Sequence, residues 1–300
     1  MIVLHQSRVH RALRVLFAAS VGSVLLSGCI LRRPLTNAFG FQPKPMRSER
    51  ATPAEWGWHA ANLDTISRYD SAGGLLAWWA PASATGARCG GVLMLHGKGK
   101  NRAEMMPLGR SLQAAGYSVL VPDYRGYGGT VGEPTTSGVF ADAELAYRHL
   151  RARLGDSTTP IVILGHSMGT ALAARLARNH APNATIYISP FTRIASVVRS
   201  RAGAIGPRLF DTTMFAFNPL EDASVARTRA MVVVAGRDLL ISKTVSNAFI
   251  EGLTPAPAVL RDRRATHNGV LSSERTVRAV TDSINAWVPC SGGRNAAGSF

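Results

Sequence analysis

The sequence contains a serine in the setting expected of a catalytic nucleophile. Ser167 is the centre of Gly165-His166-Ser167-Met168-Gly169, between an apolar run over 160–164 and an Ala/Leu-rich stretch over 170–177. The first pattern predicts a buried strand and the second a helix. A serine on such a turn projects above the sheet, and the N–H groups of the helix beneath it can stabilise an oxyanion. We predict nucleophilic acyl chemistry; a structural turn serine is the alternative.

A serine hydroxyl needs a base to remove its proton and a third group to orient that base. His267 follows a predicted strand near 257–261, and Asp238 follows a predicted strand over 230–235. Asp262 is the alternative acid, but it lies so close before His267 that it belongs to the strand or its exit. In a doubly wound sheet such groups come from loops at the carboxyl ends of strands. The order Ser167, Asp238, His267 is the one expected for this architecture.

Strands and helices alternate along the chain, which indicates a mostly parallel, doubly wound sheet covered on both faces. Further strand patterns occupy 73–80, 91–95, 117–122 and 185–189, and helical patterns occupy 103–115, 138–153, 242–252 and 273–287. Between two strands, the segment 191–229 carries many apolar residues. We expect it to form a small helical cap insertion that shapes an apolar pocket; ordinary packing of two connecting helices is the alternative.

Several segments together resemble α/β-hydrolase-fold serine hydrolases, over roughly 70–288. They are His96-Gly97, Asp123-Tyr124-Arg125-Gly126-Tyr127-Gly128, Gly165-His166-Ser167-Met168-Gly169, Ser189-Pro190-Phe191, Gly236-Arg237-Asp238 and His267-Asn268. The Asp-Tyr-Arg-Gly-Tyr-Gly and Ser-Pro-Phe-Thr segments are most similar to the branch of depalmitoylase-like and related membrane-associated hydrolases.

This resemblance implies an α/β-hydrolase domain over 71–290 and an acyl-enzyme formed on Ser167. It also implies an oxyanion hole made by the backbone N–H groups of Lys98 and Met168. The chain departs from the family pattern at Lys98-Gly99-Lys100-Asn101, where a small or neutral residue is more usual after His-Gly. The departure would bring a lysine side chain toward the substrate.

The first residues resemble a bacterial lipoprotein signal peptide over 1–28. Arg8, Arg11 and Arg14 precede an apolar core over 15–26 that is too short for an ordinary membrane span. The core ends in Leu26-Ser27-Gly28-Cys29, which is similar to the box whose cysteine is lipidated. Because Ile30 follows rather than aspartate, the resemblance implies an outer-membrane lipoprotein that faces the periplasm. An ordinary signal peptide or anchor with an incidental cysteine is the alternative.

The remaining segments and cysteines complete the predicted organisation. Proline-containing residues 29–70 predict a tether with an irregular lead-in segment, which Trp56 and Trp58 would pack onto the domain, and 291–300 predict a flexible tail. Cys89 precedes a strand and Cys290 follows the last helix, so both should lie at the edge opposite the active site. In an oxidising periplasm they could form a disulfide; two unrelated thiols are the alternative.

Composition limits the partners and cofactors that we expect. The formal charge is +16, but the basic residues are scattered and form no nucleic-acid motif. We therefore expect an anionic membrane surface rather than DNA or RNA as partner; a solvated, arginine-rich surface is the alternative. Cysteines and histidines show no metal-ligand spacing, and Gly97-Lys98-Gly99-Lys100 lacks the phosphate-loop pattern, so no metal or cofactor is expected.

These patterns predict a lipid-anchored serine hydrolase that cleaves a carboxylic ester or thioester of a small-molecule or lipid-like acyl substrate. Two other functions remain open. A non-catalytic envelope lipoprotein could keep the fold and bind a lipid or partner, and a peptidase or amidase could use the same residues.

Overall fold

The apolar runs form one eight-stranded sheet in the order β1-β2-β4-β3-β5-β6-β7-β8. The computed structural model describes residues 40–44, 46, 52–68, 73–82, 89–204, 206 and 215–290. The strands are β1 (Asn62–Ile66), β2 (Leu75–Ala80), β3 (Gly90–Leu95), β4 (Tyr117–Pro122), β5 (Ile161–His166), β6 (Ala184–Ile188), β7 (Arg229–Arg237) and β8 (Ala258–Thr266). β1, β2 and β4 pair antiparallel, and all other neighbours pair parallel. The predicted mostly parallel sheet is confirmed.

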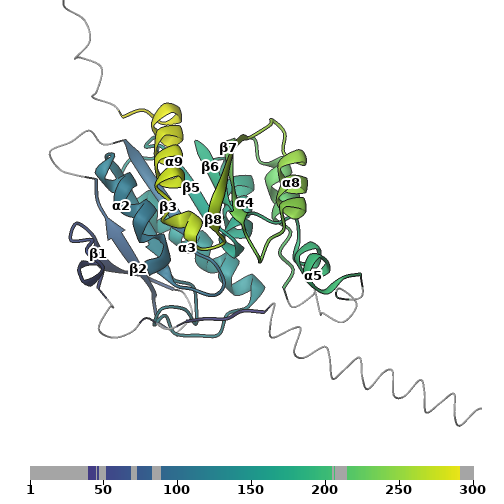
Figure 1. Cartoon of the computed structure of the whole chain (residues 1–300). Coiled ribbons are helices and arrows are strands. Elements are labelled where there is room, and N and C mark those ends of the chain that lie inside the picture. Colours follow the sequence, from purple (N-terminus) through teal and green to yellow (C-terminus); the bar gives the residue numbers. More distant parts are fainter. Residues whose placement is uncertain are drawn as a thin grey trace, which may run out of the picture.

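Helices cover both faces of this sheet (Figure 1). The longer helices are α2 (Met106–Ala114), α3 (Thr136–Leu154), α4 (Met168–His180), α8 (Lys243–Glu251) and α9 (Glu274–Trp287). Buried side chains of α3, α4 and α8 pack into one hydrophobic cluster on the sheet, and those of α2 and α9 pack into the other. Because β3, β5 and β6 are buried on both faces of the sheet, their sequences are nearly continuously hydrophobic.

The edge strands are where the structure departs most from the sequence pattern. β8 continues to Thr266, past the predicted end near 261, and its charged residues are tolerated because most of its side chains are exposed or half-exposed. β1 lies inside 29–70, which was expected to be irregular before the domain begins at 71. That expectation is wrong for Asn62–Ile66, since an edge strand with Ile66 alone buried shows no apolar run.

The tryptophans of the lead-in segment pack onto the domain as expected. Trp58 is buried, and its ring lies edge-on to Trp78 of β2 with the centroids 6.4 Å apart. Trp56, in the short helix η2 (Ala54–Trp56), lies 6.3 Å from the same Trp78 ring. The lead-in is therefore held by aromatic contacts as well as by β1.

The predicted cap region contains α5 (Ile194–Ala202) and α7 (Pro219–Val225). α7 packs on α4, where Arg175 and Arg178 donate to the buried carboxylate of Asp222 at 2.7 and 2.9 Å. α5 instead lines a cavity beside Ser167, together with Phe215 and Phe217. Among the described residues of the insertion, α5, Phe215 and Phe217 line the cavity and α7 does not.

Cys89, just before β3, and Cys290, just after α9, are joined by a disulfide. The bond ties the last helix to the amino end of a central strand, as the sequence placed them. The predicted signal peptide, Cys29 and the tail 291–300 lie outside the described residues. Among the residues that are described, none of the helices has the length and apolarity needed to cross a bilayer.

Candidate active site

Ser167 occupies a strained turn between β5 and α4. Its backbone has φ 53°, in a region that favours glycine. A side chain at Gly165 would collide with the carbonyl of Gly169, and one at Gly169 with the carbonyl of Leu95. The Ser167 N–H donates to the Ile188 carbonyl at 2.9 Å, which fixes the turn to β6. The predicted strand–turn–helix arrangement of the serine is present.

Asp238 and His267 come together from the ends of β7 and β8. Nδ1 of His267 lies 2.7 Å from Oδ2 of Asp238. The other carboxylate oxygen of Asp238 accepts the backbone N–H groups of Leu240 and Ile241, both at 2.8 Å. Because a carboxylate only accepts hydrogen bonds, Nδ1 carries the proton, and Nε2 keeps a lone pair that can accept the proton of a nucleophile.

The surroundings set the charges of this pair. Burial lowers the pKa of His267, and the nearby His166 lowers it further, while the hydrogen bond to Asp238 opposes both. Burial would raise the pKa of Asp238, but the hydrogen bond from His267 and the backbone N–H groups outweigh it and leave this pKa below its usual value. At neutral pH the pair is therefore a neutral imidazole beside a carboxylate.

Asp262, the alternative acid, has a different role. Its carboxylate accepts hydrogen bonds from the Ser273 hydroxyl and, at 3.2 Å, from the Thr276 hydroxyl. Both partners stand at the start of α9, so Asp262 anchors that helix. The geometry thus pairs His267 with Asp238.

Ser167 and His267 are linked through the residue before the serine. His166 Nε2 lies 2.9 Å from the His267 carbonyl oxygen, and the two imidazole rings lie 4.9 Å apart. Within the described part of the chain, no hydrogen bond joins the Ser167 hydroxyl to His267. In ligand-free enzymes such a contact is often long and shortens when substrate binds.

A cavity of about 300 Å³ opens beside Ser167. Most of the described lining is apolar and comes from the chain around Phe41, from Met168, Phe191 and α5, and from Phe215 and Phe217. The Phe41 ring contacts the Phe215 and Phe217 rings with centroids 5.2 and 5.9 Å away. The lead-in segment therefore builds part of the pocket wall, which its proline-rich sequence did not indicate.

The two predicted oxyanion-hole residues both line this cavity. Met168 is the first residue of α4, so its N–H has no acceptor within the helix. Lys98 follows Gly97, at which a Cβ atom would lie 3.4 Å from Cβ of Ser167. The backbones of both residues thus lie next to the serine.

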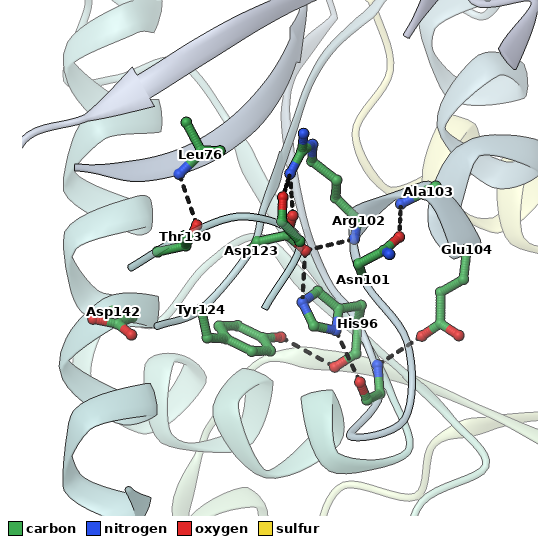
Figure 2. A network of polar contacts seen from close by, with 12 residues as sticks. Leu76, His96, Asn101, Arg102, Ala103, Glu104, Asp123, Tyr124, Thr130 and Asp142 are labelled. Atoms are coloured by element: carbon green, nitrogen blue, oxygen red, sulfur yellow. Dashed lines mark hydrogen bonds and ion pairs between the residues drawn. The ribbon is translucent and has the colours of Figure 1, made fainter. Parts of the chain in front are cut away.

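A buried polar network holds the turn that carries Lys98 (Figure 2). Asp123, after β4, forms an ion pair with Arg102 and accepts the Arg102 backbone N–H at 2.7 Å. The Tyr124 hydroxyl donates to the His96 carbonyl at 3.1 Å. Glu104 accepts the Gly97 N–H at 2.7 Å. Burial would raise the pKa of Glu104, but its contacts with His166, His96 and the Gly97 N–H outweigh burial and leave this pKa below its usual value.

Sequence reasoning missed several members of this network. Glu104 and Asp142 lie in predicted helical patterns, where a charged residue normally indicates a solvated face, and Arg102 lies just before the first of them. No local signal marks these three residues as buried. The guanidinium of Arg125 donates to the Asp142 carboxylate at 2.7 Å. His180, the other histidine after Ser167, pairs with Glu144 and stacks on Tyr147, away from the reacting groups.

Known proteins share this fold and parts of this sequence. Lysophosphatidylserine lipase ABHD12 of Xenopus tropicalis is 33% identical over 160 residues, which cover 51% of this chain and 40% of that protein. The chicken protein of the same name is 37% identical over 126 residues, which cover 40% of this chain and 32% of its own. These matches span less than half the length of either relative.

Solved structures with low sequence identity share the fold. An esterase of Pyrococcus furiosus superposes with a TM-score of 0.67 at 20% identity, over 83% of this chain and 99% of its own. A soluble variant of monoglyceride lipase from Saccharomyces cerevisiae superposes with a TM-score of 0.59 at 16% identity, over 77% of this chain and 95% of its own. The profile of the family described as serine aminopeptidase, S33, matches residues 86–267, the range that holds Ser167, Asp238 and His267. The chain therefore belongs to this family of α/β-hydrolase-fold serine hydrolases.

Proposed function

We propose that this protein hydrolyses carboxylic esters of acyl chains, with Ser167 as nucleophile. The observation that carries the proposal is the 2.7 Å contact between Asp238 and His267 beside a strained serine that lines an apolar cavity. Ser167 Oγ attacks the acyl carbon while His267 Nε2 takes its proton. The backbone N–H groups of Lys98 and Met168 stabilise the oxyanion. His267 then protonates the leaving alcohol, and water hydrolyses the acyl-enzyme by the same steps.

The lining of the cavity supports an acyl ester or thioester as substrate. Its described residues are mainly aliphatic and aromatic, which suits an acyl chain. The relatives named lysophosphatidylserine lipases also support an acyl ester as substrate.

The family description favours a second candidate, an aminopeptidase. Recognition of a free α-amino group needs a carboxylate or carbonyl acceptor near the serine. The charged residues among the described lining are Lys98 and Arg201, which would repel an ammonium group. We therefore favour ester hydrolysis over aminopeptidase activity.

The anchor part of the proposal rests on the sequence of residues 1–30. A lipidated Cys29 would tether the protein to the outer membrane, facing the periplasm, where a Cys89–Cys290 disulfide is stable. The chain from Cys29 to Gly40, which lines the cavity, can span at most about 40 Å. An enzyme held this close to lipid could take acyl substrates from the membrane surface.

The test is hydrolysis of p-nitrophenyl esters of increasing acyl length by the full chain in detergent. Ser167→Ala should lower kcat by about 10⁴-fold. Ser137→Ala, at an exposed serine of α3, is the matched control and should leave the rate unchanged. Hydrolysis of aminoacyl p-nitroanilides tests for aminopeptidase activity. Equal background rates in wild type and Ser167→Ala, together with no labelling of Ser167 by a fluorophosphonate, would reject the hydrolase in favour of a binding protein.

A further inference from the structure

The loop that joins β7 to α8 exposes two adjacent leucines. It leads from the end of β7 to α8, which lies beside α5 (Figure 1). Leu239 is 87% exposed, and the next residue, Leu240, is 41% exposed. Leu240 and Ile241 also line the cavity beside Ser167. Apolar surface therefore continues from the cavity wall to the outside of the molecule.

Hydrogen bonds on both sides hold the backbone of this loop. Asp238 accepts the backbone N–H groups of Leu240 and Ile241, both at 2.8 Å. The Arg201 guanidinium donates to the Leu239 carbonyl. The backbone is thus fixed while the Leu239 side chain lies in water, where its apolar surface costs free energy. Single exposed leucines are common on protein surfaces, but two adjacent ones that extend an apolar cavity indicate a surface for an apolar partner.

Exposed cations flank the two leucines. Arg237 and Lys243 stand at the two ends of the loop, and both are exposed. Arg201, which contacts the loop backbone, is exposed as well. The one acid of the loop, Asp238, is buried. Binding to an anionic bilayer surface requires this combination, because apolar side chains enter the boundary of the acyl chains while cations meet the lipid phosphates.

We propose that the loop 237–243 docks the protein on an anionic bilayer surface, with Leu239 and Leu240 inserted at the headgroup boundary and Arg201 beside them. This contact belongs to the folded domain and goes beyond both the proposed ester hydrolysis and the proposed lipid anchor. Docking of this kind turns the cavity toward the membrane, because Leu240 belongs to both surfaces. An acyl chain then passes from the bilayer to Ser167 along apolar side chains without crossing water.

The first experiment measures whether residue 239 enters the bilayer. The full chain with Leu239→Cys carries a fluorophore on the new thiol, in vesicles of phosphatidylglycerol and phosphatidylcholine that contain nitroxide-labelled acyl chains. Cys89 and Cys290 are bonded to each other and do not take the label, and the wild-type chain gives the background labelling of Cys29. Val225→Cys is the matched control, because Val225 is 59% exposed in α7, outside the described lining of the cavity.

The nitroxide should quench the label at position 239 strongly and the label at position 225 much less. A lipid anchor in residues 1–30 alone would bring both labels near the membrane alike. Equal quenching at the two positions, or none at position 239, therefore overturns the docking surface. Quenching at position 239 should also weaken in vesicles of phosphatidylcholine alone, because the cations then lose their anionic partner. Equally strong quenching in those vesicles would reject an anionic surface.

The second readout is the ratio of two hydrolysis rates, that for monoacylglycerol in the same vesicles and that for soluble p-nitrophenyl butyrate. Leu239→Ser should lower this ratio by about 10-fold, as expected when the burial of one leucine side chain is lost. Arg237→Gln and Lys243→Gln should each lower it by about 5-fold. Val225→Ser is the matched control and should leave the ratio unchanged. An unchanged ratio in Leu239→Ser overturns the docking surface.

These readouts separate the docking surface from the proposed function. Quenching at position 239 needs no turnover and can be recorded in Ser167→Ala/Leu239→Cys, so it supports the docking surface even if no ester is hydrolysed. Ser167-dependent hydrolysis of p-nitrophenyl butyrate without quenching at position 239 rejects the docking surface alone. A dimer that Leu239→Ser dissociates in size-exclusion chromatography, without quenching at position 239, would mean that a second copy of the chain covers the leucines instead.

Discussion

His166 Nε2 and the backbone carbonyl of His267 lie 2.9 Å apart, so a hydrogen bond joins the loop of the base to the residue before the nucleophile. On its other side, Nδ1 of His166 lies 3.4 Å from Glu104 Oε1, the oxygen that accepts the Gly97 N–H. A buried chain of contacts thus connects the turn of Lys98 to His267. Neither Glu104 nor His166 is among the described lining of the cavity, so they act as positioning residues.

Removal of Glu104 should misplace the Lys98 turn. Glu104→Ala leaves the buried Gly97 N–H without its acceptor, and we expect kcat to fall by about 10- to 100-fold with a smaller change in KM. Glu104→Gln keeps an acceptor oxygen and should recover most of this loss. Steady-state kinetics with one p-nitrophenyl ester give both values. Glu133→Ala, at an exposed glutamate, is the control, and identical kcat in the wild type and Glu104→Ala would contradict the positioning role.

The two candidate acids can be separated by a matched pair of substitutions. Asp238→Asn should lower kcat by about 10⁴-fold, because the amide no longer holds His267 in the reactive tautomer. Asp262→Asn should lower the denaturation midpoint, since Asp262 holds Ser273 and Thr276, but should leave the kcat of the folded enzyme close to wild type. A larger loss of kcat in Asp262→Asn than in Asp238→Asn would mean that the pairing is wrong.

The acid limb of the pH–rate profile should lie below the ordinary histidine range. His267 must be neutral to accept the serine proton, and burial together with His166 lowers its pKa from the usual 6.5. Activity should therefore be complete near neutral pH and fall only as the pH drops through this lowered value. Measurement of kcat/KM from pH 4 to 8 tests this. An acid limb centred above pH 6.5 would show that the contact with Asp238 raises the pKa of His267 more than burial lowers it.

The Arg102–Asp123 ion pair should matter for stability. Both side chains are almost fully buried, so Arg102→Met leaves the carboxylate without its charged partner. We expect a loss of about 3–5 kcal/mol in the free energy of unfolding, measured by urea denaturation. Arg102→Met/Asp123→Asn should lose less than the sum of the single changes. Arg148→Met, which breaks an exposed pair with Glu144, should cost less than about 1 kcal/mol. Equal losses of unfolding free energy in Arg102→Met and Arg148→Met would contradict the role of burial.

The disulfide should add stability by restricting the unfolded chain. It closes a sequence separation of 201 residues, and its removal typically costs about 2–5 kcal/mol. The free energy of unfolding of Cys89→Ala/Cys290→Ala under oxidising conditions measures this cost. Addition of reductant should lower the stability of the wild type and leave that of the double variant unchanged. Two titratable thiols in the unreduced, denatured protein would show that the bond is absent.

The sequence alone determined the parts that depend on local patterns. Apolar runs predicted strands such as Tyr117–Pro122 with the observed bounds, because strands buried on both faces need continuous apolar side chains. The segment around Ser167 predicted a strand, a tight turn and a helix, and the positions of Asp238 and His267 after strands placed them at the same edge of the sheet.

Tertiary structure decided what depends on distant neighbours. Whether Asp238 or Asp262 faces His267 follows from the course of β7 and β8, and the burial of Glu104 follows from its packing against Gly97 and His166. The β1 strand has no apolar run because an edge strand buries few side chains. Arg201 and Phe41 reach the cavity from segments far from Ser167 in the sequence, so only the folded chain brings them to one pocket.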